Sequence, residues 1–258
     1  MYMHLGGSFM QTKTGILEIA KAQLALDFNC HLSDFVKNGN TLAENKLVIG
    51  RRLYDSDGCF FKALCFGGRT IISASPEIMP WCEQKLVNSD SAWFFEYQHL
   101  KLIDKKLQEF GHEIADVHHY YLPNPNTPNK KPITTIKWYE YEEILQFEDD
   151  DRFNEAFAFD DNHPDMLAVA ALDGDSIIGM AGASSDGRTL WQIGINVFHG
   201  YRGKGIGTNL TLLLKNELLM RGKIPFYGTV ESHIHSQNIA VNAGFFPAWA
   251  ELHSKVIK

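Results

Sequence analysis

The sequence predicts a mixed α/β (α+β) fold in two parts. The chain has 258 residues, which is enough for one large domain or two ordinary ones. Four prolines fall between Leu122 and Pro132, and so proline-rich a stretch cannot continue a helix or a central strand. Helical and strand periodicities alternate on both sides of it. We therefore expect an N-terminal α/β domain over 1–122, a linker over 123–132, and a mixed sheet flanked by helices over 133–258.

The composition is that of an ordinary globular protein and argues against several classes. Hydrophobic residues make up 45% and charged residues 21% of the chain. No run of 18 apolar residues occurs, which argues against a membrane span. The net charge of −7 disfavours binding to nucleic acid. The cysteines form no Cys-x-x-Cys pair, which indicates reduced thiols, a cytoplasmic location and no thiolate metal site.

The first half predicts alternating helices and strands without a chemical motif. Helices are expected over 15–28 and 96–110, and strands over 60–66, 70–74 and 115–122. His112, His118 and His119 have no carboxylate or thiol at ligand spacing, so we interpret them as core or surface residues. The role of this half cannot be predicted.

The second half predicts an ordered series of elements. A strand over 133–138 precedes helical stretches near 141–147 and 152–159. Strands follow over 167–172, 176–183 and 189–197, the first two joined by a tight turn at Gly174. A long amphipathic helix then begins near Ile206 and ends at Gly222. A strand over 226–230, a short helix capped by Ser236 and a final strand from Phe245 complete the series.

The loop from Val197 to Gly207 carries the chemistry. A strand leads into a segment with four glycines, and the segment opens a helix. Glycines let a ligand approach the backbone closely, and the first N–H groups of a helix point at that ligand. Together with the helix dipole, Arg202 and Lys204 predict a pyrophosphate site.

Two common phosphate-binding loops do not fit this segment. A Walker A loop needs Ser or Thr after its Gly-Lys pair, whereas Gly205 follows Lys204. A dinucleotide fold needs Gly-x-Gly-x-x-Gly after the first strand of its domain. Here the spacing is Gly203-x-Gly205-x-Gly207, and three predicted strands precede the loop as a meander.

Residues 133–258 resemble the GCN5-related N-acetyltransferase (GNAT) superfamily. Arg202-x-x-Gly205-x-Gly207 matches the signature of that superfamily at its strand-to-helix junction, and Gly244-Phe245 matches a common Gly-Phe pair. The order of the elements around the loop also agrees. The stretch 236–245 is similar to the zwittermicin A resistance-type branch.

The resemblance implies an N-acetyltransferase that uses acetyl-CoA and no metal. The pantetheine arm would pair with the backbone of 195–197, the loop would hold the pyrophosphate, and the N–H of Val197 would face the oxyanion. The acceptor would be a small-molecule amine, and no nucleic acid or membrane is implied. The implied donor-binding residues are Ile195, Asn196, Val197, Arg202, Gly203, Lys204, Gly205, Ile206, Gly207, Thr208, His233 and Ser236.

The sequence departs from the superfamily at its catalytic positions. Ala240 and His233 stand where relatives often have Tyr and Asn, and Gln192 stands where a Glu is common. Glu231 is the first candidate for the base that takes a proton from the amine. The acidic stretch 149–165 would suit a cationic acceptor. These departures leave a second hypothesis open, in which the domain is a CoA-binding sensor or scaffold with weak or no catalysis.

Overall fold

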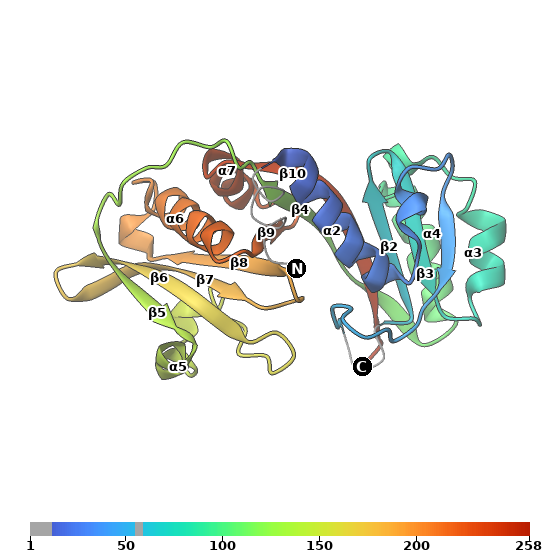
Figure 1. Ribbon diagram of the computed structural model, residues 1–258. Coiled ribbons are helices and arrows are strands. Elements are labelled where there is room, and N and C mark those ends of the chain that lie inside the picture. The colour runs from blue at the N-terminus through green and yellow to red at the C-terminus, as the bar shows by residue number, and fades with distance from the viewer. Residues whose placement is uncertain (1–11, 55–58) are drawn as a thin grey trace. The chain divides into compact units, whose positions relative to one another are not determined.

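The computed structural model describes residues 12–54 and 59–258 and divides the chain into two compact units (Figure 1). In the described part, unit 1 comprises 12–20 and Tyr121–Pro247, and unit 2 comprises 21–54, 59–120 and Ala248–Lys258. The boundaries therefore differ from the expected 122 and 133: the last residues of the chain belong to unit 2. No helix of the described residues is long and apolar enough to cross a membrane.

Unit 2 contains a sheet in which β1, β3, β2 and β10 follow one another. β1 runs parallel to β3, and the other two pairings are antiparallel. The expected helices and strands of this half are confirmed. Two of its elements, α2 and β10, begin in unit 1, and one, β4, continues into unit 1. The elements are α2 (Lys13–Phe28), η1 (Leu32–Phe35), β1 (Thr41–Glu44), β2 (Phe61–Phe66), β3 (Arg69–Ala74), α3 (Met79–Lys85), η2 (Ser91–Trp93), α4 (Tyr97–Gln108), β4 (His112–Pro123) and β10 (Phe245–Val256).

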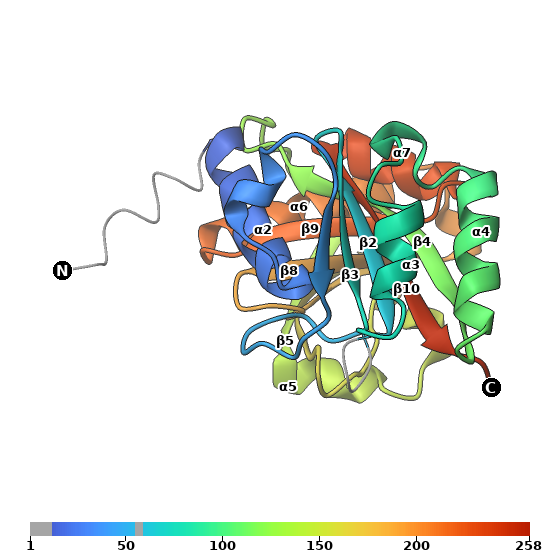
Figure 2. The same cartoon turned by 90° about the vertical axis from the view of Figure 1, so that its right-hand side faces the viewer.

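The two faces of the unit 2 sheet differ in chemistry. The helices α3 and α4 lie on one face of the sheet (Figure 2). Apolar side chains of these helices form a buried cluster there with Phe61, Ala63 and Ile72. The opposite face carries Lys62 and Glu251, which are almost completely buried. This alternation follows from the two-residue period of a strand, which sends neighbouring side chains to opposite faces.

Unit 1 contains the series of strands expected for the second half. The strand order is β5-β6-β7-β8-β9, and only the pairing of β8 with β9 is parallel. The bounds are β5 (Thr135–Glu140), α5 (Tyr141–Ile144), η3 (Leu145–Phe147), η4 (Asp151–Phe153), β6 (Asp165–Asp173), β7 (Ser176–Ser184), β8 (Leu190–Val197), η5 (His199–Tyr201), α6 (Ile206–Met220), β9 (Ile224–Thr229) and α7 (Ile234–Asn242). The expected helix over 152–159 is wrong, because only a single 3-10 turn forms there.

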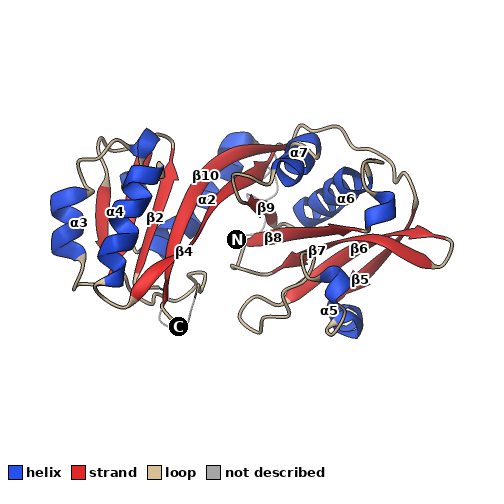
Figure 3. Ribbon diagram, turned by 180° about the vertical axis from the view of Figure 1, so that it is seen from behind, coloured by secondary structure: helices blue, strands red, loops and turns tan. Residues whose placement is uncertain are grey.

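Helices and turns cover both faces of the unit 1 sheet (Figure 3). On one face, Leu167 and Val169 of β6 pack in a cluster with the apolar stripe of α6. On the other face, Ala168 and Ala170 pack in a cluster with aromatic side chains from the segment between β5 and β6, including Phe153. Both faces of the sheet are therefore buried, which explains the nearly continuous apolar sequence of β6.

The proline-rich segment is fastened to unit 1. Asn209 of α6 donates to the carbonyl of Lys131 (3.1 Å) and accepts from the N–H of Ile133 (3.2 Å). Near its start, the N–H of Asn124 donates to the carbonyl of Gly244 (2.8 Å). A Cβ atom at Gly244 would overlap the side chain of Thr127, and its φ of +81° favours glycine. The expected linker thus lies along α6 and α7.

Candidate functional site

The strands β8 and β9 pair over only part of their length. Their register runs from Leu190↔Ile224 to Ile193↔Tyr227 and stops there. β8 continues to Val197 and β9 to Thr229, so the ends of the two strands separate. Two parallel strands that separate leave unpaired backbone groups, and a ligand can pair with them.

The pairing with β7 decides which backbone groups face this opening. The N–H of Phe198 donates to the carbonyl of Ile178, its partner in the antiparallel register. Because hydrogen-bonded and non-hydrogen-bonded pairs alternate, the groups of Ile195 and Val197 point away from β7 and towards the opening. The carbonyl of Val197 accepts from Nε of Arg202 (2.9 Å). The N–H groups of Ile195 and Val197 lie on the side of the opening.

Asn196 has a different role from the one expected. By the same alternation its backbone faces β7, and a Cβ atom at Gly179 would lie 3.1 Å from its carbonyl oxygen. Its side-chain Oδ1 accepts from the N–H groups of Glu155 (3.0 Å) and Ala156 (2.7 Å). Asn196 therefore holds the segment after η4 and offers neither its backbone nor its Oδ1 to the opening.

The exposed glycine-rich loop leads into the start of α6. Gly205 is the N-cap residue, with φ of +80° and no side-chain cap bond, and its carbonyl accepts the N–H of Asn209. The N–H groups of Ile206, Gly207 and Thr208 precede that first helical bond and have no acceptor within the helix. Arg202, Gly203 and Lys204 are exposed beside them. The structure thus brings the predicted loop residues together at one helix N-terminus, as an anion site requires.

Gly207 has a packing role of its own. A Cβ atom there would lie 3.1 Å from Cδ1 of Ile239 and 3.3 Å from Cγ2 of Val197. α6 can therefore approach α7 and the end of β8 only because residue 207 has no side chain. The second glycine of the signature therefore sets the position of the N–H groups at the start of α6.

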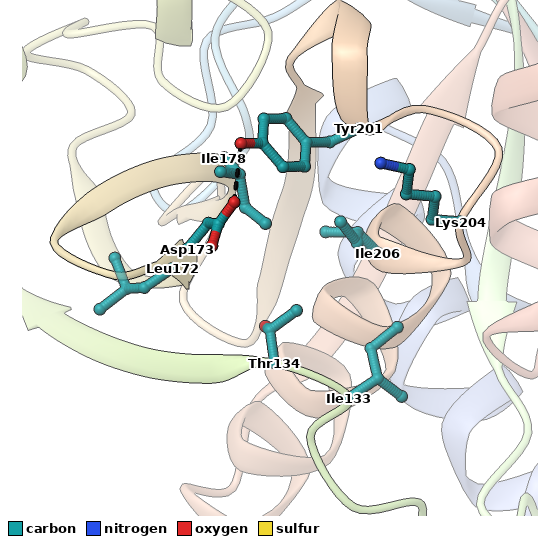
Figure 4. A pocket seen from close by; sticks show the side chains of 8 residues that line it. All are labelled: Ile133, Thr134, Leu172, Asp173, Ile178, Tyr201, Lys204 and Ile206. Atoms are coloured by element: carbon teal, nitrogen blue, oxygen red, sulfur yellow. Dashed lines mark hydrogen bonds between the residues drawn. The ribbon is translucent and has the colours of Figure 1, made fainter.

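A cavity of about 360 Å³ adjoins the loop (Figure 4). Tyr201 donates from its hydroxyl to Oδ2 of Asp173 (2.9 Å), at the end of β6. Nζ of Lys204 lies 4.9 Å from the centre of the Tyr201 ring. The full lining is Ile133, Thr134, Leu172, Asp173, Ile178, Tyr201, Lys204 and Ile206. An apolar floor with a cation and an aromatic ring at its rim suits a flat heterocycle that carries phosphate.

The start of α7 corrects one expectation. Its N-cap residue is the exposed His233, which makes no side-chain cap bond. Ser236, expected at the cap, is buried inside the helix, and its hydroxyl is 2.9 Å from the hydroxyl of Tyr227. Ser236 therefore joins α7 to β9. Burial raises the pKa of Tyr227 to about 12; the bond to Ser236 lowers it and the charge of Glu155 raises it.

The candidate base Glu231 lies in the exposed turn between β9 and α7. Its backbone carbonyl accepts from the side-chain amide of Gln237 (2.6 Å). Among the described residues, its carboxylate makes no hydrogen bond or ion pair. Glu231 is four residues beyond Tyr227, the last residue of β9 that is paired with β8.

The sequence analysis missed the segment that covers the opposite face of β8. Cβ atoms at Gly182 and Gly194 would overlap the carbonyl oxygens of Ala156 and Glu155, respectively. The signal was present in the sequence, because a glycine inside a strand often marks a close approach of another backbone. The sequence could not show which segment approaches, so Glu155 was not considered.

Comparisons with known proteins agree with the motif. Residues 131–245 match the model of the acetyltransferase (GNAT) family. No curated protein matches the chain. The chain resembles a solved GCN5-related N-acetyltransferase-like protein from Streptococcus suis 89/1591, with 15% identity, a TM-score of 0.47, and coverage of 81% of this chain and 89% of that one.

Two further solved structures show the extent of the similarity. A GNAT-family protein from Novosphingobium aromaticivorans DSM 12444 has 13% identity, a TM-score of 0.42, and coverage of 56% of this chain and 66% of that one. A GNAT-family acetyltransferase from Colwellia psychrerythraea has 14% identity, a TM-score of 0.39, and coverage of 56% and 57%. The match spans less than two thirds of the length of these two proteins.

The family match covers the strands, the glycine-rich loop and the helices that form the opening, and it ends at Phe245. Residues 131–245 of this chain therefore belong to the acetyltransferase (GNAT) family.

Proposed function

We propose that this protein transfers an acetyl group from acetyl-CoA to an amine of a small molecule. One observation carries the proposal: the opening between β8 and β9 ends beside the N-terminus of α6. A thioester with a long polar arm and a pyrophosphate fits such an opening, because the strand end offers N–H groups to the arm and the helix offers N–H groups to the phosphates.

The donor would be held by groups already described. The N–H groups of Ile195 and Val197 would pair with the pantetheine arm. The N–H groups of 205–208, with Arg202 and Lys204, would bind the pyrophosphate, and His233 would contact the donor from α7. The cavity beside Tyr201 would take the adenosine end, because its apolar floor suits a purine and the carboxylate of Asp173 can accept from the exocyclic amine.

The transfer itself needs an oxyanion donor and a proton acceptor. An N–H group that faces the opening, at Ile195 or at the predicted Val197, can donate to the oxygen of the tetrahedral intermediate. A base or a water relay must take a proton, because an ammonium group has no lone pair with which to attack. Glu231 remains the candidate from the sequence.

The acceptor is proposed to be cationic. Asp149 and Asp150 lie between η3 and η4, Asp151 begins η4, and all three are at most partly buried. Asp150 forms an exposed ion pair with Arg152 (2.6 Å), whereas Asp165 is buried and accepts from the N–H groups of Ala158 and Phe159. Asp165 therefore stabilises the fold, and the carboxylates of Asp149 and Asp151 are available to attract a polyamine or an aminoglycoside.

A second function, a CoA-binding sensor or scaffold, is favoured by one observation. Ala240, where relatives often have Tyr, is fully buried and brings no proton donor to the opening. Such a module would bind CoA through the same loop without turnover.

Calorimetric titration of acetyl-CoA, CoA and NADH, followed by a thiol-release assay over a panel of amines, separates these functions. We expect binding of acetyl-CoA and CoA, none of NADH, and thiol release with at least one amine. Binding without thiol release would support the sensor, and failure of both CoA forms to bind would refute both functions. Gly205→Val should abolish CoA binding, because a β-branched residue does not adopt the φ of +80° found there.

A further inference from the structure

Glu155 lies where β8 and β9 separate. Gly194 is the first residue of β8 beyond the last paired residue, Ile193. A Cβ atom at Gly194 would overlap the carbonyl oxygen of Glu155 and lie 3.2 Å from Cα of Ala156. We call the point where β8 and β9 stop pairing the apex of the opening. The backbone of Glu155 therefore packs directly on this apex, on the face of the sheet opposite α6.

The position of Glu155 is fixed by its neighbours, whereas its carboxylate is not engaged. The N–H groups of Glu155 and Ala156 both donate to Oδ1 of Asn196 (3.0 and 2.7 Å). The carbonyl oxygen of Ala156 packs closely against Gly182 of β7, where a side chain would overlap it. The Glu155 residue is exposed, and among the described residues its carboxylate has no hydrogen-bond or ion-pair partner.

The charge of Glu155 also affects a residue of the neighbouring strand β9. Besides burial, which is the largest cause, the negative charge of Glu155 raises the pKa of the Tyr227 hydroxyl. Tyr227 is the β9 member of the last strand pair. Glu155 thus approaches the apex from the face opposite α6 and is close enough to affect a group on β9.

We propose that the carboxylate of Glu155 accepts the proton of the acceptor amine, and that Gly194 and Asn196 position it. This inference rests on the proposed acetyl transfer. The amine reaches the apex as an ammonium ion and gives one proton to the Glu155 carboxylate. Its lone pair then attacks the thioester carbon, and the carbon–sulfur bond breaks with its electron pair on sulfur. The second proton lost by the nitrogen ends on the thiolate or in water.

The competing carboxylate, Glu231, is less well placed. It lies four positions beyond Tyr227, and the strand ends at Thr229, before the turn that contains Glu231. It lies in the turn before α7, whereas Glu155 is adjacent to the first unpaired residue of β8. A base that removes a proton in the transfer step must reach the nitrogen directly or through one water molecule.

The test compares charge-removing variants in the full-length protein. Glu155→Gln should lower kcat for thiol release by at least about tenfold, with the affinity for acetyl-CoA unchanged by calorimetry. Its residual rate should rise about tenfold per pH unit below the pKa of the amine, because only the neutral amine then reacts. Glu142→Gln, an exposed carboxylate of α5, is the matched control and should behave as the wild type.

Asn196 tests the positioning role. Asn196→Ala should lower kcat with little change in KM for acetyl-CoA, and Asn196→Asp, which still offers an acceptor to both N–H groups, should restore much of the rate. A loss in Glu231→Gln with none in Glu155→Gln would overturn the inference while leaving acetyl transfer intact. CoA binding without turnover by the wild type would instead refute the transfer on which the inference rests.

Discussion

Ile193 on β8 and Tyr227 on β9 form the last residue pair before the two strands separate. Their side chains belong to the same buried cluster, together with Leu210 and Leu214 of α6. Beyond this pair, Gly194 contacts the backbone of Glu155, and the N–H group of Ile195 faces the opening. The apex is therefore packed against a buried apolar cluster on the α6 face and closely covered by the backbone of Glu155 on the other face.

Gly194→Ala tests the close approach on the covered face. The new methyl group would overlap the carbonyl oxygen of Glu155, so the segment after η4 must shift. We expect a loss of about 1–3 kcal/mol in the free energy of unfolding, and a lower rate of the proposed acetyl transfer. Gly200→Ala is the stability control, since no heavy atom lies within 4 Å of its Cβ position. Equal unfolding free energies for the two variants would contradict the packing described.

Thr134→Trp tests the cavity beside the loop. The indole would fill space between Ile133 and Leu172 (Figure 4), so acetyl-CoA should bind at least about tenfold more weakly if its adenosine end lies there. S-acetyl-pantetheine lacks that end, and its rate of thiol release should be unaffected by the substitution. Calorimetry and the thiol assay give the two readouts. An equal loss for both donors would place the adenosine end elsewhere.

The glycine-rich loop could be predicted from the sequence because its signal is local. Gly205 and Gly207 are two residues apart, and each conformational demand is met within the loop or the first turn of the helix. Ser236 shows where local reasoning stops: a hydroxyl near a helix start suits a cap, but here it is buried against Tyr227 of another strand. The choice between a cap and a core contact depends on packing that the sequence does not state.

Contacts between distant segments could not be predicted. Glu155 and Gly194 are far apart in the sequence, and glycines at 182 and 194 indicate a close approach without naming its partner. The prediction of a helix over 152–159 was wrong for the same reason. The N–H groups of Glu155 and Ala156 donate to the side chain of Asn196, which is distant in the sequence. The return of the last strand to unit 2 likewise depends on the pairing of Trp249 with Phe66.

Lys215 should make stability depend on pH. Its side chain is fully buried in α6, Nζ donates to the carbonyl of Ala243 (2.8 Å), and burial lowers its pKa to about 8 from 10.5. Between these values the unfolded chain holds the proton and the folded chain does not, so the contribution of Lys215 to stability rises with pH.

The comparison with Lys215→Met isolates this effect from other titrating groups. The free energy of unfolding of the wild type minus that of the variant should increase between pH 8 and 10.5 by an amount on the order of 1–3 kcal/mol. Lys130→Met, at an exposed position, should show no such trend. A difference that is constant or falls over this range would show that Lys215 is not neutralised by burial.

Glu251 of β10 should be essential to the stability of unit 2. Arg52 forms buried ion pairs with Asp27 (2.6 Å) and Glu251 (3.2 Å), and Glu251 also accepts from the indole of Trp249 (3.0 Å). Removing Glu251 takes away one of the two carboxylates that balance the buried Arg52, and losing one partner of a buried ion pair costs about 3–5 kcal/mol. Glu251→Ala should therefore sharply lower the urea midpoint of the transition reported by hydrogen exchange in β2 and β10.

The matched control for Glu251 is Glu113→Ala. Glu113 pairs with Lys255 across β4 and β10 at 3.4 Å, but both side chains are largely exposed, so its loss should change stability by less than about 1 kcal/mol. Because Glu251 follows unit 1 in the chain yet packs in unit 2, its effect also measures how far the last residues complete the N-terminal fold. Equal effects of the two variants would mean that water reaches the Arg52 network and weakens it to the level of a surface pair.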